Sequence, residues 1–147
     1  MKWILRIAAF LVAVVSAIAI VGYFMPAAHE ASRSAEFTKS PEMVYALISD
    51  LKNYSSWWPD NDVNVEVVEA VPPSRFVTRI VGESAFGGTW TWDIEKTAAG
   101  SRATITERGE IYNPMFRALA RFVFGYTSSM ESCLAAAQRK LSTSSST

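Results

Sequence analysis

The stretch TWTWDIEK, residues 89–96, is the clearest secondary-structure signal in this chain. Its two tryptophans and its isoleucine alternate with polar residues, and a period of two predicts a β-strand with one buried face. The residues AAGS at 98–101 predict a tight turn, and Arg102–Tyr112 supplies the matching strand. We therefore expect an antiparallel hairpin at the centre of the fold.

Further strands and a short helical segment precede this hairpin. Alternation of apolar and polar residues predicts strands at Ser32–Thr38, Val63–Ala70 and Arg75–Val81. Ser40 followed by Pro41 predicts a helix start, because serine caps helices and proline fits the first helical position. The helical pattern then continues towards a second short helix that ends before residue 59.

One long helix is predicted after the hairpin. Asn113 can cap it and Pro114 occupies its first position. Apolar residues then recur in steps of three and four for about 26 residues, which corresponds to a helix of roughly 40 Å. Gly125 is the weak point of this pattern. The serine-rich tail at 142–147 is expected to be disordered.

The order of these elements predicts the fold class. Antiparallel strands with helices segregated from them indicate an α+β domain, here over residues 32–141. A curved sheet with a long amphipathic helix across its concave side leaves a space between the two. We therefore expect a pocket rather than a tight sandwich.

The N-terminal residues 1–26 have a different character. Ile7–Met25 is a run of 19 residues without charge, long enough to span the hydrocarbon core of a bilayer as a helix. A cleaved signal peptide or a buried core helix are alternatives, but an uncleaved signal anchor fits the length and composition better. Lys2 and Arg6 then place the N-terminus in the cytoplasm and the domain on the periplasmic or extracellular side. Residues 27–31 are expected to be a linker.

Composition and charge exclude several function classes. The residues after Pro26 carry a net charge of about −2, so no basic face for nucleic acid is expected. Cys133 is the only cysteine, which excludes an internal disulfide, and its apolar surroundings favour a buried thiol. His29 is the only histidine and falls in the predicted linker, so neither a metal site nor a cofactor is expected. A Ser-His-Asp hydrolase is disfavoured for the same reason.

Several motifs in this order give the domain a family resemblance. It resembles the START-like superfamily, also called SRPBCC or the polyketide cyclase/dehydrase family, which has the helix-grip fold. The resemblance covers about residues 32–141. It is carried by Pro41-Glu42-Met43-Val44-Tyr45, Tyr54-x-x-Trp57-Trp58-Pro59, Gly87-Gly88-Thr89-Trp90-Thr91-Trp92, Glu107-Arg108-Gly109-Glu110-Ile111 and Asn113-Pro114-Met115-Phe116-Arg117. It implies a hollow domain for a hydrophobic small molecule, while the activity differs among members and is not implied.

Glu107 is the most informative polar candidate for the pocket. Alternation along its strand places it on the same face as Ile105, which is expected to point inwards. A buried carboxylate needs a partner, so Glu107 either binds a polar ligand head, acts as an acid–base group, or pairs with a structural partner such as Arg79. These roles, and a position at the pocket mouth, remain open for Glu107 at this point.

Aromatic and apolar residues complete the predicted ligand site. Trp90 and Trp92 share one strand face and could line the pocket or belong to the core. The adjacent Trp57 and Trp58 could gate the pocket mouth or simply pack. The full predicted set is Trp90, Trp92, Ile105, Glu107, Phe122, Tyr126 and Met130 as ligand-binding residues, with Trp57, Trp58 and Phe86 at the mouth.

Three functions remain open on these grounds. The first is a membrane-anchored binding or carrier domain for a lipid or another hydrophobic small molecule, held to the membrane by residues 7–25. The second is an enzyme of the cyclase or aromatase type that uses Glu107 with Tyr112 or Tyr126. The third is a non-catalytic interaction module whose cavity is filled by its own side chains. The presence and lining of a cavity discriminate among them.

Overall fold

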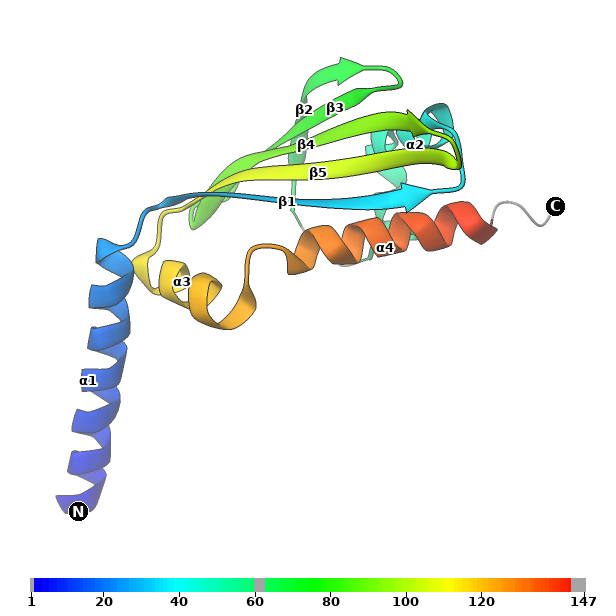
Figure 1. Cartoon of the computed structure of the whole chain (residues 1–147). Coiled ribbons are helices and arrows are strands. Elements are labelled where there is room, and N and C mark those ends of the chain that lie inside the picture. Colours follow the sequence, from blue (N-terminus) through cyan, green and yellow to red (C-terminus); the bar gives the residue numbers. More distant parts are fainter. Residues whose placement is uncertain (1, 60–62, 144–147) are drawn as a thin grey trace.

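The computed structural model describes residues 2–59 and 63–143. One long helix stands apart from a mixed α+β domain, which contains a five-stranded antiparallel sheet in the order β1-β5-β4-β3-β2. Figure 1 shows the apolar helix α1 projecting from one end of the domain, with α4 running along the sheet. The elements are α1 (Lys2–Phe24), β1 (Ala28–Phe37), α2 (Pro41–Ser49), η1 (Leu51–Ser56), β2 (Val65–Val71), β3 (Arg75–Ile80), β4 (Phe86–Thr97), β5 (Gly100–Ile111), α3 (Pro114–Leu119), the π-helical η2 (Ala120–Phe124) and α4 (Ser128–Thr143).

The central hairpin is the one that the alternation of residues 89–96 predicts. β4 pairs with β5 over its whole length, from Phe86 opposite Ile111 to Thr97 opposite Gly100. Trp92, Ile94, Ala103 and Ile105 are buried on the face that meets the helices. The predicted α+β helix-grip arrangement, an antiparallel sheet with a C-terminal helix against it, is therefore confirmed for the described residues.

Packing of two helices on the sheet forms the core. Val44 and Ile48 of α2 meet Met130 and Cys133 of α4, and all four side chains are fully buried. α4 is also tied to β1, since Arg33 donates to Glu131 across 2.7 Å. Figure 1 shows α2 at the end of the domain away from α1.

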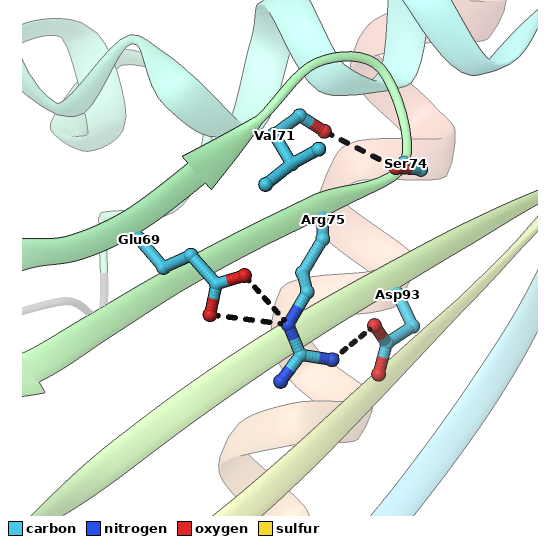
Figure 2. Close-up of polar contacts among 5 residues, drawn as sticks. All are labelled: Glu69, Val71, Ser74, Arg75 and Asp93. Carbon is cyan, nitrogen blue, oxygen red and sulfur yellow. Dashed lines mark hydrogen bonds and ion pairs between the residues drawn. The ribbon is translucent and has the colours of Figure 1, made fainter.

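An ion-pair network joins three strands at the other edge of the sheet. Arg75 on β3 lies between Glu69 on β2 and Asp93 on β4, at 3.3 Å and 2.7 Å (Figure 2). Ser74, in the turn before Arg75, donates through its hydroxyl to the carbonyl of Val71. All three charged side chains are partly exposed and none of them lines the cavity described below, so we assign the network to the positioning of the strands rather than to the binding site.

The first strand begins earlier than predicted. β1 starts at Ala28, which pairs with Glu110, so most of the predicted linker at 27–31 is part of the sheet. The prediction failed because the sheet partner that orders these residues, β5, lies about 80 positions further along the chain.

The predicted long C-terminal helix is interrupted. α3 passes into a single π-helical turn, η2, which ends at Gly125, and α4 begins at Ser128. Gly125 has φ 73° and ψ 167°, a conformation almost restricted to glycine, and this breaks the helix. Of the tail predicted to be disordered at 142–147, residues 142 and 143 belong to α4, and residues 144–147 lie outside the described residues.

Candidate functional site

A cavity of about 360 Å³ lies between the sheet and the C-terminal helical segments. Each of the five strands contributes at least one residue to the cavity wall, and so does each of η1, α3, η2 and α4. The hypothesis of an interaction module expects this space to be filled by the protein's own side chains, whereas the space is open. Its lining comprises His29, Tyr54, Trp58, Val63, Val65, Thr78, Ile80, Phe86, Gly87, Trp90, Trp92, Glu107, Glu110, Ile111, Phe116, Ala120, Phe124, Gly125, Tyr126, Ser129 and Cys133.

Stacked aromatic rings form one wall of this cavity. Trp58 stacks on Trp90 with ring centroids 5.6 Å apart, and Trp57 stacks behind Trp58 at 6.4 Å. Tyr54 packs against Trp57 and donates its hydroxyl to the carbonyl of Ile48. Burial raises the pKa of the Tyr54 hydroxyl above its ordinary value, so this group stays a neutral donor. The wall is thus apolar and held rigidly from behind.

A polar cluster interrupts the apolar lining. Oε2 of Glu107 accepts a hydrogen bond of 2.8 Å from Nε1 of Trp90, and Oε1 lies 3.2 Å from Nε2 of His29. The imidazole of His29 stacks on the ring of Tyr126 with centroids 4.2 Å apart. Glu107 and His29 are both mostly buried, at 18% and 12% side-chain exposure. The carboxyl group of Glu107 therefore has two protein hydrogen-bond partners, which offset part of the cost of its burial.

The strand register brings this cluster together. Trp90 lies directly opposite Glu107 in the β4–β5 ladder, and His29 lies opposite Gly109 in the β1–β5 ladder. A Cβ atom at position 109 would lie 2.4 Å from Cε1 of His29, so only glycine leaves room for the imidazole. Gly109 thus allows the ring to lie over β5 beside Glu107.

Buried polar atoms without a partner also lie at the cavity wall. Nδ1 of His29 and Nε1 of Trp58 are buried and have no hydrogen-bond partner within residues 2–59 and 63–143. If Nε2 of His29 donates to the Glu107 carboxylate, Nδ1 of the neutral ring is an acceptor. Such atoms can meet a polar group of a ligand.

Most of the predicted site residues line the cavity. Trp90, Trp92, Glu107 and Tyr126 do so, together with two of the three predicted mouth residues, Trp58 and Phe86. These six residues therefore lie at the cavity wall, and their contact with a ligand stays a prediction.

Four of the residues predicted for the ligand site do not line the cavity. Ile105 and Met130 are fully buried in the core and are not part of the lining, and Trp57 lies behind Trp58. Phe122 is 72% exposed and does not line the cavity. It belongs to the π-helical turn η2, which is not continuous with α4, so the helical periodicity predicted for one long helix does not apply to it.

Two predicted partners of Glu107 are also wrong. Arg79 pairs with Glu66 at 3.2 Å, on the exposed side of β3. Tyr112 is 48% exposed and does not line the cavity. Of the two tyrosines considered, Tyr126 alone reaches the polar cluster, through its contact with His29.

The predicted set lacks His29, which belongs to the polar cluster, and several apolar lining residues such as Ile80 and Ile111. The sequence signal for His29 is the alternation of residues 28–37, in which positions 29, 31, 35 and 37 are the less exposed ones in the structure. No group of three or more potential metal ligands occurs among the described residues. Cys133 is buried, and burial raises the pKa of its thiol, so it is a neutral lining group rather than a nucleophile.

Solved structures of other proteins share the fold of this domain. No family model matches the chain, and no curated protein matches it. A solved structure of the di-domain ARO/CYC StfQ from the steffimycin biosynthetic pathway matches with TM-score 0.64 and 10% identity, over 82% of this chain and 53% of that chain. This chain thus spans about half of that protein.

Two further structures match over nearly their whole length. A START superfamily protein from Mycobacterium smegmatis matches with TM-score 0.57 and 16% identity, over 77% of this chain and 99% of that chain. A protein from Nitrosomonas europaea matches with TM-score 0.60 and 12% identity, over 80% and 97% respectively. These matches confirm the helix-grip fold that the sequence motifs suggested, and at these identities they show the fold alone.

Proposed function

We propose that this protein is a membrane-anchored binding or carrier domain for a hydrophobic small molecule or lipid. The observation that carries the proposal is the cavity of about 360 Å³ between sheet and helices, walled mainly by aromatic and aliphatic side chains. Its size falls in the range of small-molecule sites. A guest that buries roughly 200 Å² of apolar surface there gains about 5 kcal/mol from leaving water.

The polar cluster defines the kind of guest. An entirely apolar molecule leaves Nδ1 of His29 buried without a partner, at a cost of about 1–3 kcal/mol. A molecule with one hydroxyl or N–H group beside its apolar part can donate to this nitrogen. We therefore infer an amphipathic guest whose single polar group lies beside His29 and Glu107 and whose apolar part lies against Trp90.

Helix α1 supports the membrane part of the proposal. It has 23 residues, or about 34 Å of helix, and it is the one helix among the described residues long and apolar enough to cross a membrane. A signal sequence has the same composition, but α1 also makes specific contacts with the domain. Gly22 packs on the backbone of Pro114, and Arg117 donates to the carbonyl of Met25. A leader that is removed has no need for such contacts.

Co-purification tests the proposal directly. The full chain is purified in mild detergent, and bound molecules are identified by native mass spectrometry and organic extraction. Ala120→Trp places an indole into the cavity wall, and Ala70→Trp makes the same change at an exposed site on β2. We expect about one equivalent of a defined apolar molecule in the wild type and in Ala70→Trp, and little in Ala120→Trp. An empty wild type, or equal loading of all three proteins, contradicts the proposal.

A second candidate function is an enzyme of the cyclase or aromatase type. The observation that favours it is the His29–Glu107 pair beside an apolar cavity, where two titratable groups can move a proton to and from a bound substrate. Glu107→Gln discriminates the two functions. A carrier holds the same molecule in the wild type and in the variant. A cyclase that dehydrates its substrate holds the product in the wild type, and the variant accumulates the unreacted substrate, which is heavier than the product by one water.

A further inference from the structure

Four large apolar side chains are exposed together on the short helices that follow the sheet. Phe116 of α3 is 50% exposed, and Phe122, Val123 and Phe124 of η2 are 65–72% exposed. We call these four residues the rim patch. A cluster of large exposed apolar residues on a protein surface indicates a contact with another apolar phase or with a partner.

The rim patch lies beside the end of α1. α3 packs against the last turns of α1, where Gly22 is buried on the backbone of Pro114. The guanidinium of Arg117 donates to the carbonyls of Ile111, Tyr112 and Met25, and so ties α1, β5 and α3 together. Figure 1 shows α3 and the following turn at the level of the upper turns of α1 rather than beyond its end.

The exposed residues of α1 at this level are also aromatic. Tyr23 and Phe24 are 70% and 82% exposed, and they share an apolar groove with Pro114 and Met115 of α3. Arg121, exposed on η2, lies in sequence directly before Phe122. Aromatic side chains with an adjacent cation are the composition typical of the interface between lipid tails and headgroups.

The rim patch is also the edge of the cavity. Phe116 and Phe124 line the cavity, and with Gly125 they are among its most exposed residues. The exposed edge of the cavity therefore includes residues of the short helical segment whose first part, α3, packs against α1.

From these positions we propose that the rim patch inserts into the surface of the bilayer that α1 crosses, so that the cavity opens towards the lipid. The occupant of this surface is a phospholipid bilayer, because the patch continues the apolar surface of the membrane helix. Arg121 meets the headgroup phosphates. The proposal rests on the proposed function in taking α1 as the membrane helix, and it adds a second contact and a route by which the guest enters from the lipid.

Depth-dependent quenching tests this proposal with the full chain. Cys133 is the only native cysteine and is buried, so a cysteine introduced at the surface can be labelled selectively. Phe122→Cys and Phe124→Cys each carry an NBD fluorophore, and the protein is reconstituted into phosphatidylcholine–phosphatidylglycerol vesicles with or without doxyl-labelled lipid. Val67→Cys and Val71→Cys are matched controls, because these are exposed apolar residues on β2. The substituted side chains are exposed, so no core contact is lost.

We expect the NBD emission at the rim patch to shift to the blue and to be quenched at least twofold by doxyl lipid, while the controls keep the emission of water. Equal emission and quenching at rim and control positions overturns the proposal. A blue shift that lipid does not quench and that grows with the protein-to-lipid ratio indicates a second copy of the chain on the patch, and it overturns the proposal as well.

A label in α1 separates this proposal from the anchor itself. Val12→Cys lies in the middle of the apolar helix and is exposed. Quenching at position 12 without quenching at position 122 leaves the anchor intact and overturns the rim contact alone. Quenching at position 122 without quenching at position 12 supports the rim contact and contradicts the membrane-spanning role of α1. Absence of quenching at both positions overturns both.

Discussion

His29 and Glu107, which are 78 positions apart in the chain, lie 3.2 Å apart between imidazole Nε2 and carboxylate Oε1. The contact joins the first strand of the chain to the last and places the only histidine of the sequence at the wall of the cavity between sheet and helices. The carboxylate also accepts from the indole of Trp90, so one acidic side chain organises the polar part of the cavity.

Removing this carboxylate tests its role in the fold. Glu107→Ala leaves Nε1 of Trp90 and Nε2 of His29 without an acceptor, and we expect it to lower the free energy of unfolding by about 1–3 kcal/mol. Glu107→Gln keeps an amide oxygen for Trp90 and should lose less than half as much. Chemical denaturation of the full chain in detergent measures both. Equal stability of the wild type and both variants contradicts the assigned hydrogen bonds.

A substitution at Gly109 should act through His29. The added Cβ of Gly109→Ala meets Cε1 and Nε2 of His29 at 2.4 Å and 2.6 Å, so the ring must leave Glu107. We expect a loss of about 1–2 kcal/mol in the wild-type background and a much smaller loss in a His29→Ala background. The double-mutant cycle is the measurement, and additive effects of the two substitutions refute the steric coupling.

The interruption before α4 depends on glycine. Gly125 has φ 73°, which strains any L side chain even though a Cβ atom there meets nothing within 4 Å. Gly125→Ala should therefore cost about 1–3 kcal/mol of stability through the backbone alone. Arg121→Ala, at an exposed position of the neighbouring turn, serves as the control and should change stability by less than about 0.5 kcal/mol. A neutral Gly125→Ala would show that this backbone conformation is not required.

Stability should fall at high pH because of Cys133. Burial raises the pKa of this thiol in the folded protein, while the thiol of the unfolded chain ionises near its ordinary value of about 8.5. Above that value the unfolded state loses a proton that the folded state keeps, so stability decreases as pH rises. Below about pH 8 both states keep the proton and the thiol has no effect.

The comparison with Cys133→Ala isolates this effect. Between pH 8 and pH 10 the wild type should lose about 1–2 kcal/mol more than the variant. Denaturation curves at pH 6, 8 and 10 measure the difference, and the values at pH 6 and 8 act as the internal control. Parallel pH profiles of the two proteins contradict a buried, neutral thiol.

Much of the fold could be predicted because its signals are local. The alternation around Trp90 predicted β4, and the Asn113-Pro114 pair predicted the start of α3, where the Asn113 side chain accepts from the backbone N–H of Met115. The inward position of Glu107 followed from the same period of two, because a sheet with one buried face has only one register that hides its apolar residues.

The parts that failed depend on distant residues or on a single backbone angle. Residues 28–31 form a strand because β5 pairs with them, and an alternation over so few residues does not by itself distinguish a strand from a linker. The apolar steps of three and four continue through Gly125 and so predict Phe122 in the pocket. The helix ends at Gly125 in the structure, so this prediction is wrong. Phe122 is instead 72% exposed, because the helix passes into a π-helical turn and ends at Gly125.

The sequence by itself determined which segments are strands and helices, which face of the central hairpin is apolar, and that the first helix is apolar along its length. These properties follow from the periodicity and composition of neighbouring residues. Only the tertiary structure decided that His29 meets Glu107, that a cavity remains open, and that its exposed edge lies beside α1. Those features arise where strands and helices far apart in the chain are packed together, and the positions of such contacts are not encoded in any one segment.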